Sequence, residues 1–81
     1  MQVTLRHFAA AREATGVESE TYDVPPETTV GGLFEEATRR HPELAPLAGQ
    51  LRFALGEDFA ERDTELAPDS VVALIPPFGG G

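Results

Sequence analysis

The sequence predicts an α+β domain in which a mixed sheet of four to five strands packs against one main helix. Three observations predict it: short apolar runs near both ends of the chain, one amphipathic stretch between them, and proline or glycine where each element stops. A chain of 81 residues is long enough for one domain with one compact core. We expect residues 1–78 to form this domain and residues 79–81 to form a flexible glycine tail.

The first third of the chain predicts two strands and a short helical segment. Residues 2–8 alternate in part, with Val3 and Leu5 on one face, which is typical of a half-buried strand. Residues 9–14 are strong helix formers that end at a Thr-Gly pair, so we expect one or two helical turns there. A second strand should run over about residues 19–24, because the two prolines that follow cannot donate to a ladder.

The main helix is predicted from Thr29 to about residue 40. Thr29 is a favourable N-cap, and apolar residues recur behind it at helical spacing. The pair His41-Pro42 then ends the helix, since proline disfavours helical geometry in the residue before it. In the loop that follows, Leu44 and Leu47 are expected to cover the core.

The last third predicts a hairpin and a buried final strand. Residues 50–60 alternate around a Gly-Glu-Asp turn, which is typical of a hairpin. The run 71–75 is wholly apolar, so we expect this strand in the interior of the sheet rather than at an edge. The complete order of elements is that of the β-grasp fold, with the first and last strands paired in parallel at the centre of the sheet.

Composition and charge exclude several functions. The net charge of -8, with acidic residues spread along the chain, argues against a nucleic-acid partner and favours a basic protein partner. The absence of cysteine excludes disulfides, thiolate metal sites and a catalytic thiol. No apolar run is long enough to span a membrane and no secretory signal is present, so we expect a cytoplasmic protein without membrane association.

Side chains within the domain carry weaker signals. The two histidines, His7 and His41, are expected on different elements in structural or surface roles, with no metal site. The acidic residues between 57 and 65 lack the spacing of an EF-hand loop, so we expect a solvated edge or, as the alternative, part of a docking surface. Four phenylalanines are expected in the core: Phe8, Phe34, Phe53 and Phe59.

The C-terminal run carries the predicted chemistry. Two prolines close the last strand, an aromatic residue follows, and only glycines remain: Pro76, Pro77, Phe78, Gly79, Gly80 and Gly81. Glycines can thread a narrow channel in a partner because only backbone must fit, and Phe78 would anchor in a partner's pocket. The carboxylate of Gly81 is a poor electrophile until adenylation by ATP supplies a leaving group. Since the chain has no phosphate-binding loop, ATP must bind to another protein.

These residues resemble the MoaD/ThiS group of ubiquitin-like sulfur carriers, most closely the small subunits of molybdopterin synthase. The terminal motif is the specific match, and three internal motifs support it. The matching segments span nearly the whole chain: Arg12-Glu13 before the turn at Gly16, Thr29-Val30, His41-Pro42-Glu43-Leu44, and Pro76 to Gly81.

The resemblance implies a β-grasp fold and a chain that is not an enzyme on its own. It implies that an E1-like adenylyltransferase activates Gly81, that a sulfurtransferase serves as the indirect sulfur source, and that a thiocarboxylate forms. The tail would then enter the large catalytic subunit of molybdopterin synthase and deliver sulfur to a pterin precursor. No cofactor would be bound by this chain itself.

Three other functions remain open from the residues alone. The tail chemistry could serve another acceptor, in thiamine thiazole, cysteine or tRNA thiolation. The chain could be a ubiquitin-like modifier whose C-terminus becomes amide-linked to lysines of other proteins. It could also be a plain interaction domain with an inert tail.

Overall fold

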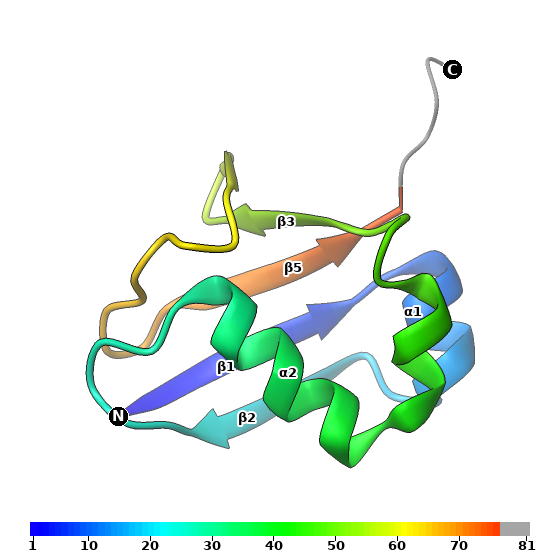
Figure 1. Cartoon of the computed structure of the whole chain (residues 1–81), viewed down its shortest axis with the longest axis horizontal. Helices are drawn as coiled ribbons and strands as arrows, with labels where there is room; N and C mark the ends of the chain where they lie inside the picture. Colours follow the sequence, from blue (N-terminus) through cyan, green and yellow to red (C-terminus); the bar gives the residue numbers. More distant parts are fainter. Residues whose placement is uncertain (77–81) are drawn as a thin grey trace.

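A computed structural model describes residues 1–76 and confirms the predicted order of elements. The loop expected after the main helix is instead a 3-10 helix, η1. Figure 1 shows the elements in chain order: β1 (Gln2–His7), α1 (Ala9–Thr15), β2 (Ser19–Asp23), α2 (Val30–Arg40), η1 (Pro42–Leu47), β3 (Arg52–Leu55), β4 (Asp58–Ala60) and β5 (Val71–Ile75).

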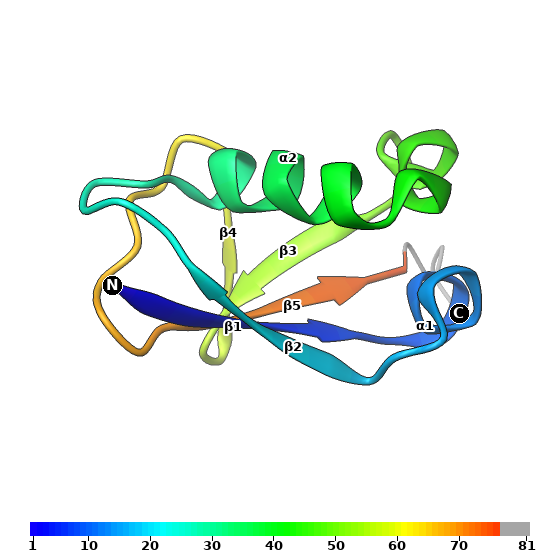
Figure 2. The ribbon, with the colours of Figure 1, turned by 90° about the horizontal axis from the view of Figure 1, so that it is seen from below.

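The strands form one mixed sheet in the order β2-β1-β5-β3-β4. The first and last strands pair in parallel, from Thr4 opposite Val71 to His7 opposite Leu74, as predicted. The other neighbouring strands are antiparallel. Because β1 and β5 are parallel, both end at the same edge of the sheet, where Figure 2 also shows α1 and η1.

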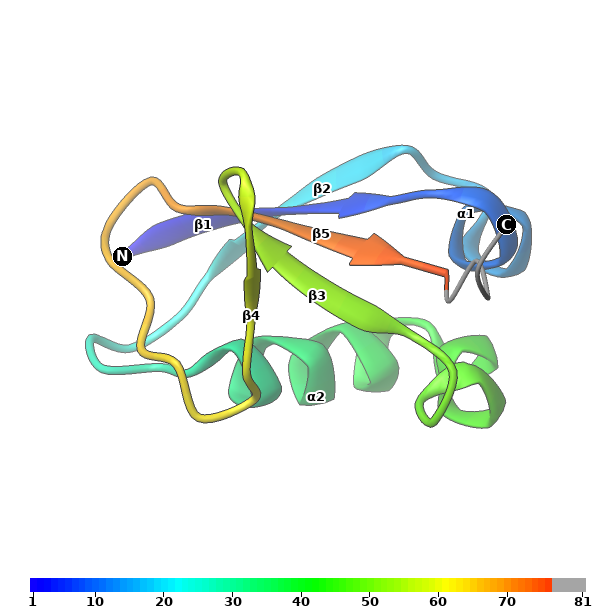
Figure 3. The same ribbon diagram turned by 90° about the horizontal axis from the view of Figure 1, so that it is seen from above.

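Helix α2 covers one face of the sheet and forms the core with it (Figures 2 and 3). The helix begins where predicted, since the Thr29 hydroxyl accepts a hydrogen bond of 3.1 Å from the Gly32 amide. Its apolar stripe packs on inward-facing side chains of β1, β3 and β5 in a single cluster that includes Val3, Leu5, Leu33, Phe34, Ala37, Phe53, Val72 and Leu74. Both Leu44 and Leu47 of η1 pack with this core, as expected.

Gly31 allows a close approach between the first turn of α2 and the chain that follows β4. Its amide donates a 2.8 Å hydrogen bond to the carbonyl of Arg62. A Cβ at this position would lie 3.1 Å from that oxygen. The low helix propensity of glycine is therefore offset by a tertiary contact that a larger residue would obstruct.

Two of the four phenylalanines expected in the core lie outside it. Phe34 and Phe53 are buried and meet edge to face, with ring centroids 5.5 Å apart. Phe8, in contrast, is 39% exposed and Phe59 is 70% exposed. The last inward-facing residue of β1 is His7, and Phe8 comes after it. Phe59 pairs with Ala54, whose side chain points away from α2, so Phe59 also points away from α2.

Candidate functional site

The candidate site begins where β5 leads the chain out of the sheet. Of the predicted tail residues, Pro76 is described and is half-buried, whereas Pro77, Phe78, Gly79, Gly80 and Gly81 lie outside the described residues. Beside the end of β5, four residues line an open hollow whose surface is almost wholly apolar: Phe8, Ala9, Ile75 and Pro76. An apolar hollow at the base of the predicted tail is suited to contact with another protein.

Strand β5 is a fixed base for this exit point. It is hydrogen-bonded to β1 on one side and to β3 on the other. Its inward side chains Val72 and Leu74 are 1% and 0% exposed. A central strand that is hydrogen-bonded to a neighbour on each side, and whose inward side chains lie in the core, resists local opening. The position of Ile75, where the strand ends, is thereby set by the core.

Apolar residues continue from this edge across the face of the sheet that α2 does not cover. We call this surface the open face. Strand register places Ala54 of β3 between Ala73 of β5 and Phe59 of β4. Val71, earlier on β5, is 43% exposed. The open face is defined by Phe59, Val71, Ala73 and Ile75, with the buried Ala54 between them, and its exposed aromatic is typical of a protein contact.

Two arginines flank the open face and bring positive charge to its border. Because side chains alternate along a strand, Arg6 and Arg52 point to the same side of the sheet as the residues of the open face, and each stacks on an aromatic ring. The Arg6 guanidinium lies 5.1 Å from the Phe8 centroid, and that of Arg52 lies 5.8 Å from the Phe59 centroid. This surface therefore favours an apolar partner with acidic groups at its rim, although the net charge of the whole chain favoured a basic one.

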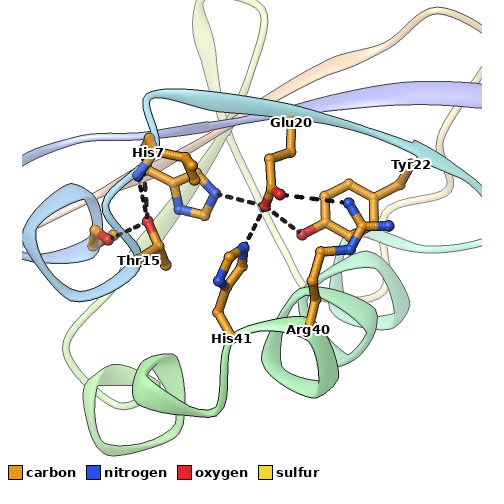
Figure 4. A network of polar contacts seen from close by, with 8 residues as sticks. His7, Thr15, Glu20, Tyr22, Arg40 and His41 are labelled. Atoms are coloured by element: carbon orange, nitrogen blue, oxygen red, sulfur yellow. Dashed lines mark hydrogen bonds and ion pairs between the residues drawn. The ribbon is translucent and has the colours of Figure 1, made fainter.

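A second cluster of functional groups lies on the covered side of the sheet, near the end of α2 (Figure 4). Glu20 of β2 accepts a 3.2 Å hydrogen bond from the Tyr22 hydroxyl, and its Oε1 lies 2.6 Å from Nε2 of His41. Nε2 of His7 lies 3.9 Å from the same oxygen, and Arg40 is 3.6 Å from Oε2. The two histidines lie on different elements, as expected, and both face this one carboxylate.

Burial and charge shift the titration of this cluster. Burial lowers the pKa of His7, an effect that the Glu20 charge partly opposes. Burial acts to raise the pKa of Glu20, but its hydrogen bond to His41 and the charges around it hold that pKa below its ordinary value. Burial, together with Glu20, raises the pKa of Tyr22 to about 12.

Sequence reasoning missed this cluster because its members come from β1, β2 and the end of α2. One signal was present, since His7 continues the inward pattern of Val3 and Leu5. Within residues 1–76, no group of three or more His, Cys, Asp or Glu side chains is arranged to hold a metal ion. The acidic residues between 57 and 65 are exposed, as expected of a solvated edge. None of the helices described here could cross a membrane.

Residues 5–81 match the ThiS family. The chain belongs to this family. A human protein named molybdopterin synthase sulfur carrier subunit is 40% identical to it over 83 aligned residues, which cover 99% of this chain and 94% of the human one. The predicted resemblance is confirmed.

Solved structures of similar shape confirm the β-grasp fold of this ThiS-family chain. SAMP1 of Haloferax volcanii superposes with a TM-score of 0.88, at 24% identity and with all of both chains covered. A second match comes from a Helicobacter pylori protein–protein complex of subunits 1 and 2 of molybdopterin-converting factor. It has a TM-score of 0.73 at 22% identity, again with all of both chains covered.

Proposed function

We propose that this ThiS-family protein is the sulfur-carrier small subunit of a molybdopterin synthase, with the C-terminal carboxylate of Gly81 as the group that carries sulfur. The observation that carries the proposal is the 40% identity to the human protein of that name over 99% of the chain. The residues resemble the same subunits in the terminal motif and in three internal motifs. On this proposal the chain is a carrier and contributes no catalytic side chain.

The fold supports the proposal by the way in which it presents the end of β5. A reactive terminus must reach an active site in another protein, and a fixed base makes its reach reproducible. β5 is held on both sides by other strands and ends at Ile75, beside an apolar hollow. Pro76 interrupts the ladder there because it has no amide hydrogen to donate.

The proposed chemistry takes place on the backbone carboxylate. The carboxylate attacks the α-phosphorus of ATP, pyrophosphate leaves, and an acyl adenylate forms. A sulfur nucleophile, supplied indirectly by a sulfurtransferase, then attacks the carbonyl carbon and AMP leaves. The nucleophile is the outer sulfur of a persulfide on the donor, so an acyl disulfide forms. A second thiol of the donor then attacks the inner sulfur, the S–S bond breaks as a donor disulfide forms, and the terminus leaves as a thiocarboxylate, whose sulfur is a nucleophile at neutral pH. ATP and the groups that bind it belong to an E1-like activating enzyme.

The open face supports a stable partner in addition to the threaded tail. We propose that Phe59 and its apolar neighbours dock on the large synthase subunit while the tail enters that subunit's active site. An exposed aromatic on the edge strand β4, with arginines bordering the same surface, is the residue type on which the energy of many protein interfaces depends. The facing surface should then be apolar at its centre, with carboxylates opposite Arg6 and Arg52.

Intact-protein mass spectrometry tests the carrier chemistry. The full chain is incubated with its E1-like enzyme, ATP and a sulfur source, and we expect a mass increase equal to the exchange of one oxygen for one sulfur. A chain lacking Gly81 is the matched control and should show no increase. Should the full chain remain unmodified beside an activating enzyme that loads another carrier, the proposal is wrong.

Coexpression identifies the acceptor. We expect a stable complex with the large subunit of molybdopterin synthase, and the loaded complex should convert the pterin precursor to its dithiolene product. A loaded chain that forms no such complex but supports thiazole, cysteine or tRNA thiolation would assign it to another pathway. Glycine remnants on lysines of other proteins would instead indicate a modifier.

A further inference from the structure

His7 is a buried titratable group that the proposed carrier function does not use. It is the third inward-facing residue of β1, after Val3 and Leu5, and is 2% exposed. Within residues 1–76 it is, apart from Tyr22, the one buried polar side chain, and neither of its ring nitrogens has a hydrogen-bond partner there, whereas the Tyr22 hydroxyl donates to Glu20. Burying an imidazole without partners is unfavourable, so this position is not explained by packing alone.

One carboxylate and a second imidazole face His7. Glu20 reaches it from β2, with Oε1 3.9 Å from Nε2 of His7. His41, the C-cap of α2, presents its ring edge-on, with the centroids 6.0 Å apart. These are the two groups whose charges act on the pKa of His7. The strand neighbours on β5 and β3 are apolar, and on the α1 side Thr15 donates its hydroxyl hydrogen to the Ala11 carbonyl.

Glu20 is already engaged by three other side chains. His41 lies 2.6 Å from Oε1, Tyr22 donates to the same oxygen at 3.2 Å, and Arg40 is 3.6 Å from Oε2. Arg40 also stacks over the Tyr22 ring, 4.1 Å from its centroid. The carboxylate therefore connects β2 to the last turn and the C-cap of α2.

A proton on His7 would disturb this arrangement. The ring is closed off from water, and its nearest carboxylate oxygen, Oε1 of Glu20, is 3.9 Å away and already bound to His41, so a positive charge on His7 favours a rearrangement. Either Glu20 leaves His41 and pairs with His7, or the elements around His7 separate and admit water. Both changes weaken the link between β2 and the end of α2.

We propose that His7, Glu20 and His41 form a pH-sensitive latch, which holds the end of α2 on the sheet at neutral pH and releases it on acidification. In the closed state Glu20 is bound to His41 and Arg40, and His7 is neutral. In the open state a protonated His7 is hydrated or paired with Glu20. The segment released is His41 with η1, which packs against both α1 and α2.

The latch lies next to the exit point of the chain. His7 is the last residue of β1 and is paired with Leu74, and Phe8 follows it directly and lines the apolar hollow. Release of the latch is therefore expected to be detected at Phe8 as well as in η1. The inference does not depend on sulfur chemistry at Gly81.

Hydrogen exchange and histidine NMR on the full chain test the latch. Amide opening is measured from pH 8 to pH 5 in residues 7–20 and 41–48, corrected for intrinsic exchange, with residues 53–60 as the internal reference. Opening that exposes one histidine of ordinary pKa to protonation should increase between pH 7.5 and 5.5, by at most about tenfold. The reference segment should change much less, and the His7 ring signal should titrate below its ordinary midpoint.

Variants identify the group responsible. His7→Phe, which keeps an aromatic ring without a proton site, should remove most of the pH dependence. Arg12→Gln, which breaks the exposed pair with Glu18, is the control and should leave it intact. The proposal is wrong if opening of the wild-type protein does not depend on pH, or if the increase in opening on acidification persists in His7→Phe. If His7→Phe does not fold, the NMR signal of the His7 ring in the wild-type protein decides. The proposal is overturned if that ring titrates at its ordinary midpoint while amide protection does not change.

Discussion

Nε2 of His41 lies 2.6 Å from Oε1 of Glu20, a contact that joins the C-cap of α2 to the edge strand β2. Glu20 retains 19% of its side-chain exposure and His41 retains 15%. Contacts of this kind between partly buried groups contribute more than surface ion pairs do, since solvent screens them less.

Removal of the Glu20 charge should destabilise the fold. Glu20→Gln keeps the shape of the side chain but leaves Arg40 and His41 without their carboxylate, so we expect a loss of about 1–2 kcal/mol in the free energy of unfolding. Urea unfolding at neutral pH measures it. The exposed Glu13→Gln is the matched control and should stay within about 0.5 kcal/mol of wild type. Equal midpoints for the two variants would contradict a role for Glu20 in stability.

Stability should decrease in two steps as the pH falls. His7 has a folded pKa below its ordinary value of 6.5, so its contribution is present above pH 6.5 and is lost progressively below it. The folded pKa of Glu20 is also lowered, so a second loss begins below its ordinary value of 4.5. Denaturant titrations between pH 8 and pH 3 measure both steps. His7→Phe should remove the first step and keep the second.

The single tyrosine should ionise late. Burial and the Glu20 charge raise the pKa of Tyr22 to about 12, from an ordinary value of 10.0. Because the chain has one tyrosine, the ultraviolet signal of the phenolate reports Tyr22 alone. Glu20→Gln should lower the midpoint, since a neutral neighbour repels the phenolate less. A wild-type midpoint at 10.0 in a chain still folded at that pH would show that Tyr22 is not buried beside Glu20.

Phe59 should matter for partner binding and little for folding. Its side chain is 70% exposed, so Phe59→Ala should change the free energy of unfolding by less than about 0.5 kcal/mol. If the open face docks on the large synthase subunit, affinity should fall about tenfold or more. Calorimetry with the purified large subunit measures the change. Arg39→Ala, on the exposed side of α2, is the control, and equal affinities for both variants would exclude the open face from the interface.

Gly31 should resist substitution although it lies in a helix. In Gly31→Ala the new Cβ would lie 3.1 Å from a backbone oxygen of Arg62, which cannot move aside as a flexible side chain would. We expect a net loss of about 1 kcal/mol, despite the better helix propensity of alanine. Gly49→Ala, where a Cβ would have no neighbour within 4 Å, is the control. If thermal unfolding shows that Gly31→Ala is more stable than wild type, the backbone of Arg62 must shift to admit the new Cβ, and the prediction is wrong.

Local patterns were enough to predict the elements of this protein and the pairing at its centre. The Thr29 cap, the helical spacing behind it and the apolar run 71–75 each depend on residues close in sequence, and all three appear as predicted. The terminal motif likewise indicated the ThiS family, because it is one contiguous run. The roles of Pro77 and Phe78 to Gly81 stay predictions, since those residues lie outside the described part of the chain.

Tertiary structure decided what no local pattern contains. Whether Phe59 faces the core or the solvent depends on its pairing with Ala54, and its apolar character predicted the wrong side. The meeting of His7, Glu20 and His41 depends on the placement of two strands and a helix end that are separated in the chain. Hydrophobic burial acts on the summed surface of all elements, so it fixes which side chains meet only when the sheet and helix pack together.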